Sequence, residues 1–315
     1  MTEERRKALA ALIRSGAVPM EPEVPPLPPE LDALVYPGAG PFEPSAAIRA
    51  ALFDVYGTLF CSAAGDIAAA GPGSGTTEHL DPLAAVFKRT GAELRAYFYS
   101  AVEKRRRASP SPYPEVRVEE IWAAFLAETG DSADFTGDEE ELALRYELAV
   151  NPVYPMPGAL ETLRTLKRRG YILGIISNAQ FFTPLLFDAF FGAGPEELGF
   201  EPELLIYSFE AGEAKPAPAL FGRAADRLGK RGIAPEACVY IGNDMLNDID
   251  GAAGAGFKTL LFAGDRRSLR LRGYPRRKIS GGDSYSGGGS GQKPPTGIIR
   301  SLADIAGILG GRAGF

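Results

Sequence analysis

The chain is poor in the residues that several common kinds of site require. Of its 315 residues only two are cysteines, Cys61 and Cys238, and one is a histidine, His79. The cysteines lie far apart and outside any Cys-x-x-Cys pattern, which excludes a disulfide framework and a cysteine-rich zinc site. One histidine excludes a histidine-rich metal centre, and a Ser-His-Asp triad would have to include His79. Because His79 follows a Gly/Ser/Thr stretch, we expect it at an exposed position near a helix start. Carboxylates, hydroxyls and lysine are therefore the candidates for catalysis.

Long apolar runs and a strong net charge are absent too. No run is long enough to span a bilayer, and the first residues lack the apolar segment of a signal peptide, so we expect a cytoplasmic protein. The formal net charge is −6, which gives no indication of binding to nucleic acid or to an anionic membrane. We expect a small-molecule partner, with no nucleic acid and no membrane involved. The oligomeric state stays open.

Short apolar runs alternate with segments of helical spacing from residue 48 onward. Such continuous apolar runs, each followed by a helix, are typical of buried parallel strands, and the fold class predicted is α/β with a doubly wound parallel sheet. Ligands bind at the carboxyl edge of such a sheet. The expected strands are Ala51–Phe53, Ile172–Ile176, Leu204–Tyr207, Val239–Ile241 and Thr259–Phe262.

Two segments depart from this alternation. Residues 65–155 have only helical spacing, which predicts an insertion of about four helices with no strand. Residues 1–46 predict an N-terminal extension with a short helix and a stiff spacer, since Val18–Leu31 carries six prolines and favours extended structure. The core is then expected to comprise residues 47–64 and 156–315. Within it, Ser280–Gly291 predicts a flexible Gly/Ser loop.

Polar residues capable of chemistry follow four of the expected strands. Asp54 ends the first strand and is followed by Gly57, which permits a tight turn, and by Thr58. A carboxylate at a strand end can act as a nucleophile. Ser177 and Asn178 end the next strand, where a hydroxyl and an amide can bind an oxyanion.

The other two segments supply a cation and a group of oxygen ligands. Lys215 precedes Pro216 at the start of a helix and can neutralise anionic charge. Asn243, Asp244 and Asp248 follow an apolar strand and a glycine, and their oxygens suit a hard cation such as Mg²⁺. Each segment alone is also typical of ordinary turn or helix-capping chemistry.

In this order the four segments resemble the motifs of the haloacid dehalogenase superfamily. The match is close at Glu210–Pro218 and at Gly242–Ile249, and the helical insertion resembles the mobile cap of that family. The resemblance implies a hydrolase with Asp54 as a covalent nucleophile. It also implies that Thr58, Ser177, Asn178 and Lys215 bind the substrate anion, and that Mg²⁺ is held by Asp54, the backbone carbonyl of Tyr56 and a choice among Asn243, Asp244 and Asp248.

Two positions depart from the family pattern. Phosphatases of the family have a second aspartate, which protonates the leaving group, where this chain has Tyr56, the residue type found in the dehalogenases. A phenol with a pKa near 10 is a poor acid at neutral pH. Asn243 replaces the usual first acidic residue of the fourth motif, although Asp244 and Asp248 are retained.

We therefore expect Mg²⁺-dependent hydrolysis of a small phosphorylated metabolite with a good leaving group. The alternatives are a metal-independent 2-haloacid dehalogenase and a catalytically inactive binding module of the same fold. Tyr97, Tyr99, Arg105 and Trp122 are candidates to face the cleft from the cap. A basic cluster after the last strand is typical of a solvated edge, and contact with a large anionic partner is the less favoured reading; its members are Arg266, Arg267, Arg270, Arg272, Arg276, Arg277 and Lys278.

Overall fold

A computed structural model describes residues 1–36, 48–62, 77–130, 134–274 and 293–310. The predicted Gly/Ser loop, with Arg276, Arg277 and Lys278, lies outside the described residues. None of the described helices is long and apolar enough to cross a membrane.

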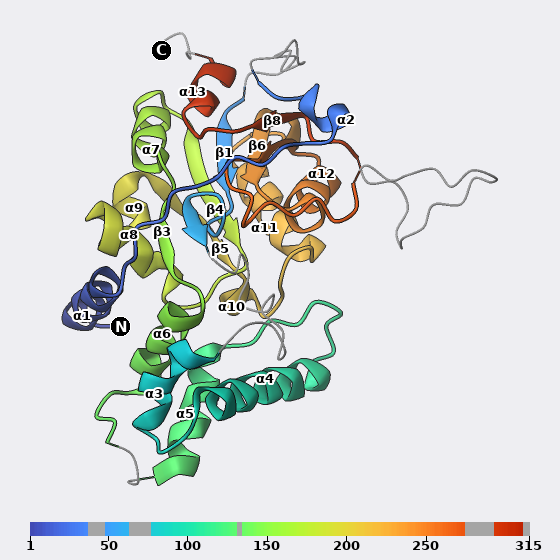
Figure 1. Ribbon diagram of the computed structural model, residues 1–315. Helices are drawn as coiled ribbons and strands as arrows, with labels where there is room; N and C mark the ends of the chain where they lie inside the picture. Colours follow the sequence, from blue (N-terminus) through green and yellow to red (C-terminus); the bar gives the residue numbers. More distant parts are fainter. Residues whose placement is uncertain (37–47, 63–76, 131–133, 275–292, 311–315) are drawn as a thin grey trace.

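A six-stranded, fully parallel sheet forms the centre of the molecule (Figure 1). Its order is β5-β4-β1-β6-β7-β8, so the first strand lies in the middle, between the strands that carry the second and fourth motifs. Phe53 lies opposite Ile175 on one side and Ile241 on the other, which aligns the strand ends. The strands are β1 (Ala50–Phe53), β4 (Ile172–Ser177), β5 (Phe200–Tyr207), β6 (Cys238–Gly242), β7 (Lys258–Phe262) and β8 (Gly297–Ile299). The predicted α/β fold class is confirmed.

Helices cover both faces of this sheet because both faces are apolar. Ala51 and Phe53 of β1 belong to one buried cluster, and Ala50 and Leu52 belong to another, as the alternation of side chains along a strand requires. The first cluster packs against α7 (Ala159–Arg168), α8 (Thr183–Phe191) and α13 (Asp304–Ile308); the second packs against α11 (Pro218–Gly229) and α12 (Gly251–Gly254). Short helices α9 (Pro195–Leu198) and α10 (Ser208–Ala211) flank β5, and a π-helical turn covers Met245–Asp250.

The helical segment between residues 77 and 150 lies together below the sheet in Figure 1. Trp122 is fully buried at its centre, stacked on Phe98 at 5.6 Å and packed on Tyr146 at 4.9 Å between ring centroids. Tyr97 packs on Phe125 and Tyr99 on Phe98. Trp122 therefore stabilises the segment itself, and the prediction that it faces the cleft is wrong. Tyr97 and Tyr99 are half-buried, and for them it stays a prediction. The helices are α3 (Asp81–Ala85), α4 (Gly91–Ala108), α5 (Val118–Thr129) and α6 (Glu139–Val150), preceded by a 3-10 turn, Glu78–Leu80.

The expectation of no strand in the insertion is also wrong. A two-stranded antiparallel sheet joins β2 (Phe60–Ser62), just after the first motif, to β3 (Val153–Pro155), where the chain returns. Each strand has only three residues, which is too short to produce a readable alternation. The chain leaves the sheet domain through β2 and returns to it through β3, so this pairing places the two connections to the helical segment side by side.

The N-terminal segment packs against the rest of the protein. Helix α1 (Glu3–Ser15) contacts α8 and α6, burying Leu9 and Ile13, and Arg6 pairs with Asp188 at 2.8 Å. The proline-rich stretch was expected to be extended, but it ends in helix α2 (Pro29–Asp32) because proline is tolerated at the first helical position. Val35 then forms a parallel bridge with Ile298, extending the sheet edge at β8.

Candidate active site

Asp54 stands at the carboxyl end of the central strand β1. Its backbone N–H donates to the carbonyl of Ile241 at 2.9 Å, which continues the sheet register to the last residue before the turn. Gly57 then adopts φ +79, and a Cβ there would lie within 2.8 Å of Asn243 and Ser268. Only glycine permits this approach, so the turn places the first motif directly against the fourth.

Lys215 lies between two carboxylates of the site. Its Nζ donates to Asp54 Oδ1 at 2.7 Å, to Asp248 Oδ1 at 2.5 Å and to the hydroxyl of Tyr240 at 3.1 Å, with only 3% of its side chain exposed. Burial alone would lower the pKa of Lys215, but the charges of Asp248 and Asp54 outweigh it and raise the pKa above its ordinary value. The lysine is therefore a permanent cation at neutral pH. Asn178 positions it, because its Oδ1 accepts from the Lys215 backbone N–H at 2.7 Å.

Asp248 organises the fourth motif. Its Oδ2 accepts from the backbone N–H groups of Asn243 and Asp244, both at 2.9 Å, and its Oδ1 accepts from Lys215 and Tyr240. Gly242 makes this possible, since a Cβ there would lie 2.4 Å from the Asp248 carboxyl carbon. Burial raises the pKa of Asp248, against the lowering effect of Lys215. Both oxygens of this carboxylate already serve the protein's own donors.

A small cavity of about 60 Å³ lies where these strand ends meet. Of the site residues predicted from the sequence, most line it: Asp54, Tyr56, Asn178, Lys215, Asn243, Asp244 and Asp248. Asn247, Arg270 and Arg272 complete the wall and were not predicted to belong to the site. The basic cluster was the signal that pointed to the two arginines. Both arginines line the cavity, and Arg272 is exposed as well, as the interpretation of a solvated edge expects.

Thr58 and Ser177 lie beside the cavity but bond to the site's own groups. The Thr58 hydroxyl is fully buried and donates to Asn243 Oδ1 at 3.1 Å. Ser177 Oγ donates to Asp54 Oδ1 at 2.8 Å and is equally buried. In this arrangement both hydroxyls position other site residues, which differs from the expectation that they bind the substrate directly. Within the described parts of the chain, both hydrogen bonds to the Asp54 carboxylate go to Oδ1, and none goes to Oδ2.

The Tyr56 hydroxyl is bound to Thr183. The two oxygens lie 2.9 Å apart, and both side chains are buried. Burial raises the pKa of Tyr56 above its ordinary value, and the negative charges of Glu147 and Asp54 add to this effect. A phenol held in this way does not supply a proton to a leaving group near neutral pH.

Asp244 is paired with Arg272. The arginine Nε lies 3.2 Å from Oδ1 and 3.0 Å from Oδ2 of the carboxylate, and Nη2 lies 2.6 Å from Oδ2. Asp244 Oδ1 also accepts from the backbone N–H groups of Leu246 and Asn247, which caps the π-helical turn. The carboxylate is thus engaged on both oxygens from the protein side.

The residues that line the cavity offer oxygen ligands for a hard cation. Their net negative charge is smaller than that of a site built from carboxylates alone. Among the described residues, no three His, Cys, Asp or Glu side chains are grouped so as to hold a metal ion. Asp54, Asn243 and Asp244 all line one cavity, with Asp244 paired to Arg272. This set of oxygens fits Mg²⁺, which keeps several waters and needs only one or two carboxylates.

The helical segment meets the site through residues 111–118. Pro114 forms an antiparallel bridge with Glu213, and the N–H of Ala214 donates to the carbonyl of Tyr113 at 2.8 Å, one residue before Lys215. Gln180, just after the second motif, donates to the Val116 carbonyl at 2.9 Å and accepts from the Val118 N–H at 3.1 Å. The helical segment is therefore bonded directly to the two loops that carry Asn178 and Lys215.

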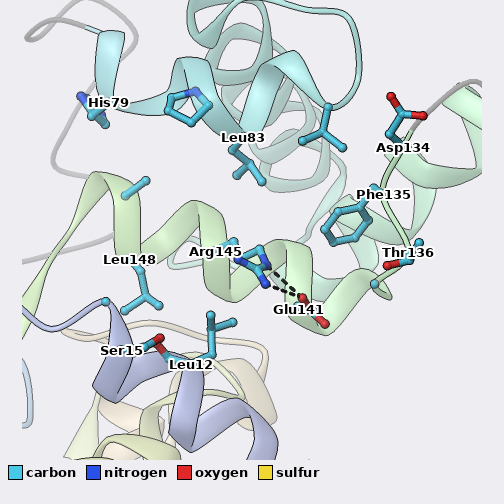
Figure 2. Close-up of a pocket in the computed structure, with 15 residues that line it drawn as sticks. Leu12, Ser15, His79, Leu83, Asp134, Phe135, Thr136, Glu141, Arg145 and Leu148 are labelled. Atoms are coloured by element: carbon cyan, nitrogen blue, oxygen red, sulfur yellow. Dashed lines mark hydrogen bonds and ion pairs between the residues drawn. The ribbon is translucent and has the colours of Figure 1, made fainter.

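A larger pocket of about 550 Å³ lies between α1, α3 and α6 (Figure 2). Figure 2 shows its apolar lining, with Leu12, Leu83 and Leu148 beside an ion pair in which Arg145 lies 2.8 Å from Glu141. His79 borders it and is exposed, as expected from the sequence. The described residues around this pocket include no carboxylate bonded to a buried lysine.

The fold and the site together define a protein of the α/β class with a carboxylate–lysine centre at the carboxyl edge of a parallel sheet. The chain belongs to the haloacid dehalogenase-like hydrolases, whose family model matches residues 48–256.

Among curated relatives, the chain is 31% identical over 173 residues to a ribulose-1,5-bisphosphate 5-phosphatase of Halopiger xanaduensis, covering 54% of this chain and 58% of that protein. It is 33% identical over 113 residues to a glyceraldehyde 3-phosphate phosphatase of Pyrococcus furiosus, covering 34% and 41%. The chain thus spans about half the length of the curated relatives it matches. Similar solved structures include a 2-haloacid dehalogenase of Pseudomonas syringae, with 19% identity, coverage of 83% of this chain and 98% of that one, and a TM-score of 0.49.

Proposed function

We propose that the protein hydrolyses a small phosphorylated metabolite whose leaving group is stable as an anion, with Mg²⁺ as cofactor. The observation that supports this most is the state of Tyr56. Its hydroxyl is buried against Thr183 and its pKa is raised, so nothing at this position replaces the aspartate that protonates an alkoxide. Aryl phosphates, acyl phosphates and anhydrides need no such proton.

Asp54 would act as the nucleophile through Oδ2. This oxygen attacks phosphorus, the bond from phosphorus to the leaving oxygen breaks, and the leaving group departs as its anion. Water then hydrolyses the aspartyl phosphate, giving inorganic phosphate and the free carboxylate. Ser177 and Lys215 hold Oδ1 throughout, and Lys215 offsets the negative charge that gathers when a phosphate approaches the carboxylate.

Mg²⁺, when bound, would shield the negative charge of the phosphoryl oxygens. Asp54, the backbone carbonyl of Tyr56 and members of the set Asn243, Asp244 and Asp248 would hold it. Asp248 has both oxygens bonded to protein donors, so Asn243 and Asp244 are the better candidates among the three. The residues 77–150 would serve as the cap over the substrate, within the domain limits predicted from the sequence.

The curated relatives named above are a ribulose-1,5-bisphosphate 5-phosphatase and a glyceraldehyde 3-phosphate phosphatase, which supports a small phosphorylated substrate. Both of those substrates are alkyl phosphates, so the preference for a good leaving group rests on Tyr56 alone. A second candidate, 2-haloacid dehalogenation, is favoured by one specific observation: Asp244 is neutralised by Arg272 and Asn243 is uncharged, so the site has little negative charge to offer a metal. In that reaction Asp54 would attack carbon and release halide, and water would hydrolyse the resulting ester. A catalytically inactive binding module is the third alternative.

The test is phosphate release from a panel of aryl, acyl and alkyl phosphates, with and without Mg²⁺. We expect Mg²⁺-dependent release that is fastest for the aryl and acyl phosphates. Equal rates for alkyl and aryl phosphates would contradict the role assigned to the leaving group. Absence of release from every substrate, with halide release from 2-haloacids, would replace the proposal by the second candidate; absence of both would leave the binding module.

A further inference from the structure

Arg272 reaches the site from a segment that follows the last long strand, β7. The carbonyl of Asp265 accepts from the Ser268 and Leu269 N–H groups, which starts a turn. The chain then runs back along the fourth motif: the Arg270 N–H donates to the Asn243 carbonyl, and the Met245 N–H donates to the Arg270 carbonyl, each at 2.9 Å. Two backbone bonds thus fix this segment beside Asp244.

The backbone of Arg272 adopts a conformation that few residues of its kind adopt. Its φ is +51, in the left-handed region that usually favours glycine. Its side chain meets Asp244 through three nitrogen–oxygen distances of 3.2 Å or less, in the fork-like geometry that gives strong pairs. The pairing is therefore specific in geometry and does not depend on charge alone.

The two partners differ in exposure. The Arg272 side chain is 42% exposed, whereas that of Asp244 is 9% exposed. The guanidinium can therefore move into solvent, while the carboxylate stays at the wall of the cavity. Lys215 already neutralises part of the charge of Asp54 and Asp248. The charge of Asp244 is neutralised instead by Arg272, which lies outside the four strand-end motifs.

We propose that Arg272 sets the affinity of the site for a divalent cation by competing with it for Asp244. A divalent ion can take Asp244 as a ligand only after the Arg272 guanidinium has left the carboxylate. The ion and the guanidinium therefore compete for the same oxygens. The free energy of ion binding is therefore less favourable than in the same site without Arg272. The difference is the free energy of the Arg272–Asp244 pair. For a coupling of ordinary size, removal of Arg272 tightens ion binding roughly tenfold. This inference rests on the proposed function only in taking a divalent cation to be the cofactor.

The test is the dissociation constant of Mn²⁺, measured on the full chain from the electron paramagnetic resonance signal of free Mn²⁺, and repeated with Mg²⁺ by calorimetry. The variant is Arg272→Gln, and the matched control is Arg266→Gln. The control removes a positive charge from the same segment, where Arg266 pairs with Glu23 at 2.9 Å and does not line the cavity. We expect Arg272→Gln to bind Mn²⁺ roughly tenfold more tightly than the parent, and Arg266→Gln to bind it as the parent does.

A double-mutant cycle locates the effect. With Asp244→Asn in the background, Arg272→Gln should no longer change the Mn²⁺ affinity, because the carboxylate for which both compete is gone. Unchanged or weaker Mn²⁺ binding by Arg272→Gln alone, in a protein with the circular dichroism spectrum of the parent, would overturn the proposal, as would no Mn²⁺ binding by either chain. Tighter binding without phosphate release from any substrate would support the role of Arg272 and reject the phosphatase instead.

Discussion

Two of the protein's pockets differ greatly in size, and the smaller one is lined by the groups proposed to react. The pocket between α1, α3 and α6 measures about 550 Å³ and is lined by leucines and other apolar side chains, by His79 and Asp134, and by one surface ion pair (Figure 2). The cavity at the strand ends measures about 60 Å³ and is walled by three carboxylates, one lysine, two arginines and amides. The two pockets differ in the contacts that hold the charged side chains of their walls in place.

The three carboxylates on the wall of the small cavity pair with cations from distant parts of the chain. Asp54 and Asp248 share Lys215, and Asp244 is paired with Arg272. In the large pocket, Glu141 pairs with Arg145, four residues along the same helix, at 2.8 Å, a contact worth only a few tenths of a kcal/mol, and more loosely with Arg5 of α1 at 3.7 Å. Buried charges held by long-range contacts mark a functional site more reliably than volume does.

The largest effect is expected at the nucleophile. Asp54→Asn keeps the shape of the residue and its bond to Ser177 but removes the nucleophilic carboxylate. We expect phosphate release to fall by at least about 10³-fold. Steady-state phosphate release measures this, with Asp138→Asn as the control because Asp138 is half-exposed at the N-cap of α6. Full activity in Asp54→Asn would reject a covalent role for this residue.

The next effect concerns stability. Lys215→Met leaves Asp54 and Asp248 buried without their cation, and the free energy of unfolding should fall by about 3–5 kcal/mol. Urea denaturation measures the loss, and exposed Lys230→Met is the control, with no significant change expected. Adding Asp248→Asn to Lys215→Met should recover part of the stability. A Lys215→Met protein as stable as the parent would show that the two carboxylates do not depend on the lysine.

The sequence identified the small cavity well because its groups lie at the ends of apolar strands. The placement of Asp54, Lys215 and Asp248 follows from strand register, since the carboxyl ends of neighbouring parallel strands meet at one edge. Arg272 was missed because it reaches the site through a left-handed turn and a return segment, which leave no periodic pattern in the chain.

The sequence was less informative about the helical segment. It predicted the helices from their spacing, but not the β2–β3 ribbon, whose strands have three residues each. It also offered Trp122 as one candidate to face the cleft, whereas the ring lies in an aromatic cluster with Phe98 and Tyr146. An aromatic residue at helical spacing looks the same in sequence whether it faces a substrate or a core, and only the packing decides.

A smaller effect is expected where the helical segment meets the small cavity. Gln180→Ala removes a donor to the Val116 carbonyl and an acceptor for the Val118 N–H, both inside the interface. We expect a loss of about 1–3 kcal/mol in stability and faster amide hydrogen exchange at Val118. Gln180→Glu is the matched variant: it keeps the acceptor and loses the donor, so Val118 should stay protected. Equal protection in Gln180→Ala would show that this contact does not hold the segment in place.

The smallest effect is expected in the large pocket. Arg145→Gln breaks the pair with Glu141, in which the arginine side chain is 43% exposed, and His79→Gln changes an exposed side chain. Each should alter the free energy of unfolding by no more than about 0.5 kcal/mol, because neither removes a buried or long-range contact. Phosphate release should stay within about twofold of the parent, since neither residue lines the cavity that contains Asp54. A loss comparable to that of Asp54→Asn would reverse the comparison, because the larger hollow would then take part in the reaction.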